Sequence, residues 1–256
     1  MMKNAIFITV RTNSTRLPKK CLLEIIGIPT IVHLIRHLKM SKLADGIVLC
    51  TTDNQQDDVL CEIAAREGIA FFRGSEKDKL ERWRGAADRY GVEFFVTADG
   101  DDLFCEPELI DLAFKQYASG GADFIEGLHI PCGAFTYGIK VSALRKVCEI
   151  KGTNETEMMW VYFKETGLFK VEELKGIPDI FHRPEVRMTL DYEDDFIFFK
   201  NIIEHFSHHG QMPFTLRDVL AYLDAHPQVV KINKHRQQDF LNNQKKKIKL
   251  ILKAEH

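Results

Sequence analysis

Residues 6–23 read IFITVRTNSTRLPKKCLL, and this stretch decides the fold. Residues 6–10 form a short apolar run, which is typical of a strand buried inside a parallel sheet. A polar, turn-rich segment follows at once, and its cations and hydroxyls are Arg11, Thr12, Ser14, Thr15, Arg16, Lys19 and Lys20. Open α/β sheets bind ligands beyond the carboxyl ends of their strands. This segment therefore suits a polyphosphate held by backbone N–H groups and cationic side chains, with a solvated basic loop as the alternative.

The composition is that of an ordinary globular protein. Of 256 residues, 45% are hydrophobic and 28% are charged, and the formal net charge is −2, which gives no general attraction to nucleic acid or to an anionic membrane. The six cysteines include no CxxC pair, which favours reduced thiols over disulfides or a zinc site. No apolar run approaches the ~20 residues that span a bilayer, and the first run is too short for a signal peptide. We expect a cytoplasmic protein without a nucleic-acid partner and without stable membrane insertion.

Strand and helix patterns alternate through the first half of the chain. After the first strand, apolar runs at 47–52, 69–72 and 92–97 predict three more strands. Apolar residues at helical spacing, or charged segments with helical boundaries, lie between and after them at about 31–38, 59–64, 77–90 and 107–117. This βαβα succession predicts a Rossmann-like three-layer α/β/α fold with a mainly parallel sheet.

The pattern loosens after residue 120. We expect strands at 122–125, 135–141, 169–173 and 186–190, and helices at 142–148, 155–165, 193–206 and 216–225. The 155–165 segment is apolar nearly all round, so it should be buried in the core or against a second subunit. We expect residues 1–233 to form the main domain, with a small acceptor or dimerisation subdomain at about 128–185. Residues 234–256 form a basic tail, in which KKKIKLILK could make an amphipathic helix at a membrane surface, although a frayed end or packing on a partner subunit is favoured.

Acidic side chains follow three of the predicted strands. Asp99, Asp101 and Asp102 follow the fourth strand, Asp191 follows the 186–190 run, and Asp53 follows the second strand. Magnesium takes oxygen ligands, typically one or two carboxylates together with substrate phosphates and water. Carboxylates opposite a cationic loop would suit a magnesium–nucleotide site, and capping of the helices that follow is the alternative.

These segments together resemble the cytidylyltransferases, a family that includes the CMP-Kdo synthetases, the acylneuraminate cytidylyltransferases and, closest to this chain, the SpsF-type spore-coat polysaccharide proteins. The motif RxxSTRLPxKxL in the first loop carries the resemblance. Further matches follow in the same order as far as about residue 233: IVLCTTDNQQDD, FFRGSEKDKLERW, the GD of residues 100–101, RMTLDYEDDF and HPQVVKINKH. The resemblance implies that the nucleotide is bound by Arg11, Ser14, Thr15, Arg16, Lys19, Lys20, Thr52, Asp53, Arg73, Gly74 and Ser75.

The resemblance also implies a reaction and its residues. An acceptor oxygen, from an acidic sugar or a related acid or phosphate, would attack the α-phosphorus of CTP and release pyrophosphate, in the synthesis of a surface polysaccharide or glycoconjugate. The implied catalytic residues are Arg11, Lys20, Asp99 and Asp101. Asp101 and Asp191 would hold Mg²⁺. Glu157, Arg183 and Arg187 are candidate acceptor contacts, with a structural role in the second subdomain as an equal alternative. Homodimerisation is expected from the family.

The departures from the family pattern lie where the acceptor should bind. Lys19 replaces a glycine, and could contact a phosphate or point into water. Asp99 stands where CMP-Kdo synthetases have a glutamine, and its charge would repel an acidic sugar unless it is paired or bound to metal. The 127–133 loop, GLHIPCG, departs from the family pattern as well. A sugar-1-phosphate nucleotidyltransferase, a glycosyltransferase using the DxD of residues 99–101, and a non-catalytic nucleotide-binding homologue therefore stay open as alternatives.

Overall fold

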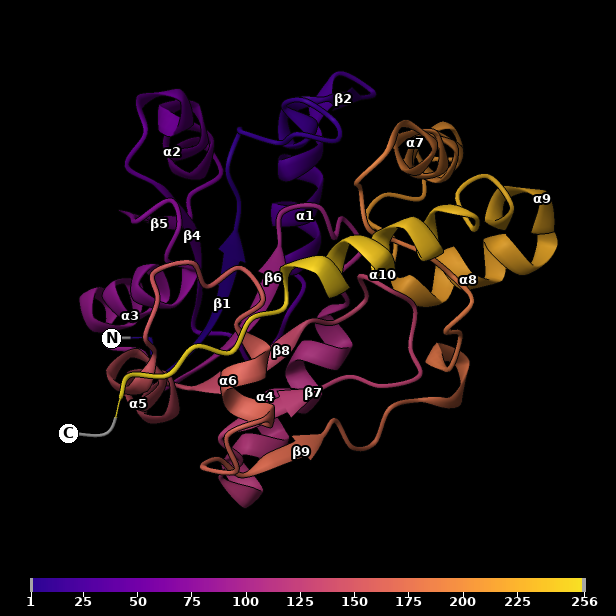
Figure 1. The fold of residues 1–256 in the computed structure, drawn as a ribbon. Coiled ribbons are helices and arrows are strands. Elements are labelled where there is room, and N and C mark those ends of the chain that lie inside the picture. Colours follow the sequence, from indigo (N-terminus) through magenta and orange to yellow (C-terminus); the bar gives the residue numbers. More distant parts are fainter. Residues whose placement is uncertain (1, 255–256) are drawn as a thin grey trace.

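The computed structural model describes residues 2–254, whose main feature is a seven-stranded sheet flanked by helices (Figure 1). The strand order is β5-β4-β1-β6-β8-β7-β9. Four adjacent strands are parallel to one another, namely β1 (Asn4–Thr9), β4 (Gly46–Thr52), β6 (Phe94–Asp99) and the edge strand β5 (Ala70–Gly74). β8 (Tyr137–Lys140) runs antiparallel between β6 and β7 (Phe124–Glu126), and β9 (Val171–Glu173) lies parallel to β7. The predicted α/β class with a mainly parallel sheet is confirmed.

The two layers of helices follow from the alternation of side chains along each strand. In β1, Ile6 and Ile8 face one layer, and Ala5 and Phe7 face the other. The first layer contains α1 (Thr30–Leu38), α2 (Asp58–Arg66), α4 (Pro107–Gly120), α7 (Glu193–His208) and α8 (Leu216–Ala225). The second contains α3 (Lys79–Tyr90), α5 (Val141–Ile150) and α6 (Trp160–Lys164). Strands buried on both faces explain the continuous apolar runs in the sequence.

Short elements complete the first half of the chain. β2 (Glu24–Ile25) and β3 (Ile28–Pro29) form a two-stranded hairpin after the first loop. The 3-10 helices are η1 (Lys20–Leu22), η2 (Gln55–Asp57) and η3 (Asp179–Phe181). Two strands of the range expected to form a small subdomain, β8 and β9, join the seven-stranded sheet.

Two of the sequence predictions in the second half are wrong. The 186–190 run is not a strand of the sheet. Its backbone pairs with the loops instead, since Cys132 N donates to Val186 O at 3.0 Å and Leu190 N donates to Asp101 O at 2.8 Å. The helix expected at 155–165 shortens to α6, whose apolar side chains pack into the core of this same chain. The apolar character of that segment therefore gives no support to a dimer, and homodimerisation stays a prediction.

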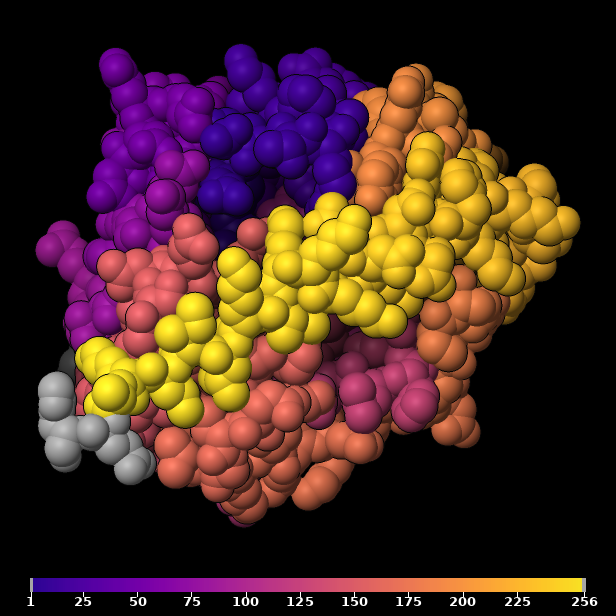
Figure 2. Space-filling model, in the orientation of Figure 1, coloured from indigo at the N-terminus to yellow at the C-terminus, as the bar shows by residue number. Residues whose placement is uncertain are grey.

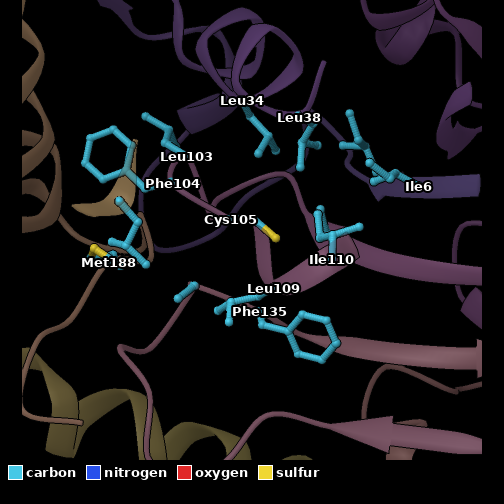
Figure 3. Close-up of a cluster of buried hydrophobic side chains, with 14 of the residues drawn as sticks. Ile6, Leu34, Leu38, Leu103, Phe104, Cys105, Leu109, Ile110, Phe135 and Met188 are labelled. Atoms are coloured by element: carbon cyan, nitrogen blue, oxygen red, sulfur yellow. The ribbon is translucent and has the colours of Figure 1, made fainter. Parts of the chain in front are cut away.

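A buried cluster anchors the loop that follows β6. Leu103, Phe104 and Cys105 are buried, and Figure 3 shows Leu103 and Phe104 beside Met188. The ring of Phe104 also lies edge-on to that of Phe199 in α7, with 4.9 Å between the ring centroids. Burial of such side chains stabilises a loop by roughly 1.5–3 kcal/mol each. The backbone of the preceding acidic residues is thus fixed between a central strand and this cluster.

The basic tail folds onto its own chain. After α9 (Pro227–Val230), α10 (Arg236–Lys247) crosses the front of the molecule in Figure 1, and an extended segment continues to a backbone bridge between Leu252 and Lys151. Because α10 ends at Lys247, a helix over KKKIKLILK, which the sequence left as the less favoured possibility, does not form. In the described part of the chain, each helix is too short or too polar to cross a membrane.

Candidate active site

The site lies where the chain reverses its direction across the sheet. From β1 the chain proceeds outward through β4 to β5, and then returns to β6 on the other side of β1. Such a reversal leaves a crevice beyond the carboxyl ends of the two central strands, where open α/β sheets bind ligands. We call residues 11–20, which follow β1, the cationic loop, and residues 99–102, which end β6, the acidic loop. Figure 2 shows a recess between the indigo N-terminal segment and the yellow C-terminal segment.

Lys20 connects three distant segments of the chain. Its Nζ donates to the carboxylate of Asp101 and lies 2.9 Å from Oδ1 of Asp191. The hydroxyl of Thr30 donates to the carbonyl oxygen of Lys20 at 2.6 Å, which fixes the end of the cationic loop on α1. Burial would lower the pKa of Lys20, but the two carboxylates raise that pKa above its ordinary value. Lys20 is therefore charged and faces both carboxylates, as the sequence predicts.

Asp191 is fully buried and surrounded by cations. Arg16 contacts its Oδ1 together with Lys20, and Arg187 Nη2 donates to its Oδ2 at 3.0 Å. Burial would raise the pKa of Asp191, but Lys20, Arg16 and Arg187 lower that pKa below its ordinary value. Both oxygens of Asp191 are thus engaged by positive side chains.

The acidic loop gathers three carboxylates. Oxygens of Asp99, Asp101 and Asp102 lie within 4.8 Å of one another, and among residues 2–254 this is the one such group suited to a metal ion. Burial and the charges of Asp101 and Asp99 raise the pKa of Asp102 well above its ordinary value. Burial also raises the pKa of Asp101, where the charges of Asp191 and Asp99 act against the opposing charge of Lys20. Oxygen donors that repel one another in this way fit a hard cation such as Mg²⁺.

This donor set differs from the predicted one. The sequence predicts Asp101 and Asp191 as the metal pair. In the structure Asp101 is grouped with Asp99 and Asp102, and both carboxylate oxygens of Asp191 contact positive side chains. Gly100 makes the tight loop possible, because a Cβ there would lie 2.7 Å from Cβ of Val10. Its N–H donates to the carbonyl oxygen of Thr9 at 2.8 Å, which ties the acidic loop to the end of β1.

Asp57 anchors the opposite end of the cationic loop, and the sequence analysis missed it. Its buried carboxylate accepts from the N–H of Thr12 at 2.8 Å, from the hydroxyl of Thr12 at 2.6 Å and from the hydroxyl of Thr52. Burial would raise the pKa of Asp57, but these hydrogen bonds lower that pKa below its ordinary value. Asp53, which the sequence favours for the nucleotide, is exposed, and its N–H donates to Gly74 O at 3.2 Å.

The family model described as cytidylyltransferase matches residues 5–165, which contain the cationic loop and the acidic loop. The chain belongs to the cytidylyltransferase family. It is 30% identical to an uncharacterized protein of Methanocaldococcus jannaschii, over 93% of this chain and 97% of that protein. It is 28% identical to the spore coat polysaccharide biosynthesis protein SpsF of Bacillus subtilis, over 76% of this chain and 84% of SpsF.

Solved structures agree with this assignment. A cytidylyltransferase from Leptospira borgpetersenii has a TM-score of 0.79 at 27% identity, over 90% of this chain and 97% of that chain. A CMP:2-keto-3-deoxy-manno-octonic acid synthetase complexed with CTP shares the fold, with a TM-score of 0.62 at 13% identity over 79% of this chain and 99% of that chain. The predicted family and fold are confirmed.

The remaining cytidylyltransferase nucleotide segments frame the crevice. Arg73 donates to the carbonyl oxygens of Thr52 and Asn54, each at 3.0 Å, so it braces the loop after β4. Gly74 ends β5, and the exposed Ser75 accepts through Oγ from the N–H of Asp78 at 3.1 Å. The other predicted nucleotide contacts lie along the cationic loop: Ser14 is half-buried, Thr15 and Lys19 are exposed, and Arg11 reaches Glu76 at 3.7 Å.

Lys79 is a further residue of the cytidylyltransferase site that sequence reasoning missed. It begins α3, and its Nζ lies 3.5 Å from Oδ1 of Asp99 and 5.3 Å from the centroid of the Trp83 ring. Its side chain is 17% exposed, so the ion pair is partly shielded from water. The pair offsets the charge of Asp99 that, on the sequence alone, would repel an acidic acceptor. A lysine inside a charged helix gives no signal of this position.

The three predicted acceptor contacts are placed differently from one another. Lys247 donates to Glu157 at 2.9 Å. Burial would raise the pKa of Glu157, but the positive charges of Lys247, Lys79 and Arg11 lower that pKa below its ordinary value. Glu157 therefore belongs to the side of the site where Lys79 lies. Arg183 pairs with Glu185 and with Asp224 of α8.

Arg187 is not available to an acceptor. Its side chain is 1% exposed, and its Nε donates to Asp195 at 2.9 Å while Nη2 donates to Asp191. A structural role was the alternative that the sequence left open for Arg187, and the structure favours it. We reassign Arg187 from an acceptor contact to the support of Asp191.

Proposed function

We propose that this cytidylyltransferase uses Mg²⁺ to transfer CMP from CTP to an acidic sugar, or to a related acid or phosphate acceptor, and releases pyrophosphate. Membership of the family supports nucleotidyl transfer. The similarity to SpsF, a spore coat polysaccharide biosynthesis protein, supports a place in the synthesis of a surface polysaccharide or glycoconjugate. The CTP complex of the CMP:2-keto-3-deoxy-manno-octonic acid synthetase supports CTP as the donor.

The observation that carries the proposal is the position of Lys20 between Asp101 and Asp191. Nucleotidyl transfer is catalysed mostly by positioning and by neutralisation of charge on the phosphates. Lys20, Arg16 and Arg11 supply positive charge from the cationic loop, and the carboxylates face them across the crevice. A triphosphate that carries its own metal ion matches this distribution, because its phosphates pair with the cations and its metal pairs with the carboxylates.

The acidic loop would hold the metal. Asp99, Asp101 and Asp102 are the oxygen donors that the structure groups, and Asp191 is the further candidate that the family resemblance implies. Bound Mg²⁺ would neutralise charge on the phosphate oxygens during transfer. Asp101 and Asp102 are deeper in the loop than Asp99, whose side chain is 34% exposed.

Asp99 is placed to meet the acceptor. Lys79 Nζ lies 3.5 Å from Oδ1 of Asp99. The carboxylate of Asp99, the most exposed of the three, would orient an acceptor hydroxyl or accept its proton as that hydroxyl attacks, while Asp101 and Asp102 hold the metal. Lys79 and Arg11 add positive charge on this side, beside Glu157. This mixture of charges favours an acceptor that carries both an anionic group and hydroxyls, as an acidic sugar does.

The test is a screen for pyrophosphate release. The purified protein is incubated with CTP, UTP, ATP or GTP and Mg²⁺, against a panel of acidic sugars, phosphorylated acceptors and phosphonates. We expect release with CTP and at least one acidic acceptor, and no release when EDTA removes the metal. Transfer of sugar from a UDP-sugar, or no release with any pair, would contradict the proposal. Light scattering on the same sample measures whether the protein is a dimer.

A further inference from the structure

The C-terminal helix α10 lies against the phosphate side of the site, beyond the residues that the family model matches. Its start is fixed by Asn233, whose side chain donates to the carbonyl oxygen of Arg187 at 3.1 Å and to Asp195 at 2.9 Å. Arg236 donates to Asp194 at 2.7 Å. These contacts seat the first turn of α10 on the segment that carries Asp191.

Two side chains of α10 then cover the guanidinium of Arg187. Gln237 Oε1 accepts from Arg187 Nη1 at 3.2 Å, and the ring of Phe240 lies 4.8 Å from the guanidinium carbon. A guanidinium over an aromatic face is attracted by the ring, more strongly where water is excluded. The buried state of Arg187 thus depends on contacts from a helix about fifty residues away along the chain.

The far end of the tail is tied to a different part of the molecule. Lys247 pairs with Glu157, and the carbonyl oxygen of Ile251 accepts from the N–H of Gly152 at 2.7 Å and from the hydroxyl of Tyr162 at 3.1 Å. The tail therefore bridges the segment before α7 and the segment between α5 and α6, and Figure 2 shows it bordering the recess. A segment tied at both ends holds its middle in a fixed place.

We propose that Phe240 and Gln237 of α10 are positioning residues for triphosphate binding, an inference that rests on the proposed function. They act through Arg187. Arg187 holds Asp191, and Asp191 in turn holds Lys20 and Arg16 in the crevice. Each contact in this series has a charged group on at least one side, which meets an opposite charge, the Phe240 ring or the amide oxygen of Gln237. Such contacts strengthen one another where water is excluded and weaken when water enters. Loss of the Phe240 ring exposes Arg187 to water and releases Asp191, Lys20 and Arg16 from their common arrangement.

Three variants test this positioning role. Phe240→Ala removes the ring, Phe240→Tyr keeps it, and Leu241→Ala alters the exposed neighbour on the same helix as a control. Isothermal titration measures the Kd for CTP in the presence of Mg²⁺. We expect the Kd to rise about 10-fold for Phe240→Ala, the size of a shielded cation–π contact, and to stay within about 2-fold for the other two variants.

Hydrogen exchange without nucleotide gives a second readout on the same three proteins. We expect faster exchange in residues 186–195 and 16–22 for Phe240→Ala alone. Binding and exchange in Phe240→Ala like those of the unmodified protein would overturn this inference and leave the proposed function standing. Failure of the unmodified protein to bind CTP with Mg²⁺ would overturn the proposed function, and this inference with it.

Discussion

Two carboxylates beyond the ends of the strands that flank β1 behave in opposite ways. Asp57, after β4, is buried among the hydroxyls and the N–H group that donate to it, and its pKa is lowered. Asp102, after β6, is buried among other carboxylates, and its pKa is raised. Burial does not explain why the two pKa values shift in opposite directions, because burial disfavours the charged form of both residues. The difference lies in what surrounds them.

That difference separates a carboxylate that stabilises the fold from the carboxylates that we propose bind a metal ion. The partners of Asp57 satisfy it within the protein, so it stabilises the cationic loop without a ligand. The acidic loop is short of positive charge even with Lys20 and Lys79 nearby, so we expect a bound cation to stabilise it. Side chains held in an unfavourable environment are the expected mark of a functional site.

The largest expected effect is on turnover, at the residue that connects the two loops. Lys20→Ala removes the charge between Asp101 and Asp191, and we expect pyrophosphate release to fall by about 10³-fold, as for other preorganised charges at a transition state. Lys115→Ala, on the exposed face of α4, is the control and should stay within about 2-fold. Steady-state assays with CTP measure both, and release by Lys20→Ala close to that of the control would remove Lys20 from catalysis.

The next effect is on stability, at the satisfied carboxylate. Asp57→Ala leaves the donors of Thr12 and Thr52 without their partner, and we expect a loss of about 3 kcal/mol. For a chain of this size that loss corresponds to a fall in Tm of about 6–12 °C. Asp53→Ala, four residues earlier and exposed, should change the stability by less than about 0.5 kcal/mol. An equal Tm for the two variants would mean that Asp57 does not anchor the cationic loop.

A pH series sharpens the same comparison. Because the folded-state pKa of Asp57 is lowered, its contribution is complete above the unfolded pKa of about 3.9 and is lost as the pH falls through the folded value. We therefore expect the difference in unfolding free energy between the unmodified protein and Asp57→Asn to shrink from pH 6 to pH 3. Denaturant titration at each pH measures it, and a difference that grows toward pH 3 would contradict the assigned direction.

The smallest expected effect concerns the acceptor side. Lys79→Met removes the charge that offsets Asp99. We expect turnover to fall by about 10-fold, because the activation barrier rises. The Kd for CTP should change by less than about 2-fold, because Lys79 lies beyond the phosphate cations. Titration and single-turnover assays separate the two quantities. A weakened CTP affinity with unchanged turnover would place Lys79 on the nucleotide instead.

The sequence was sufficient for the parts of the site that follow strands directly. The cationic loop and the acidic loop follow the ends of β1 and β6. A parallel sheet brings the ends of such strands to the same edge, regardless of how the rest of the chain folds. Lys20, Asp101 and Asp191 were therefore predicted as neighbours, and the structure places them in contact. Asp191 lies beside Lys20 as predicted even though the 186–190 run is not a strand, because Leu190 N donates to the carbonyl oxygen of Asp101. The role of Asp191 as a metal ligand stays a prediction.

Residues whose roles depend on partners in distant parts of the chain could not be predicted in this way. Asp53, Asp57 and Asp58 lie within one short acidic stretch, and nothing local shows that Asp57 is the one that Thr12 reaches. Lys79 looks like any other lysine of a charged helix, and Arg187 looks like a possible ligand contact until α10 is seen to cover it. Each of these roles is set by a partner that is distant in the sequence.

The most direct test of the account is a pair of measurements on Asp101→Asn: its Tm without ligand, and its affinity for CTP with and without Mg²⁺. We expect the variant to melt no lower than the unmodified protein, because a like charge has been removed from the acidic loop, and to lose the increase in CTP affinity that Mg²⁺ gives. A variant that melts well below the unmodified protein and still binds CTP more tightly with Mg²⁺ would show that Asp101 supports the fold and not the metal-bound nucleotide.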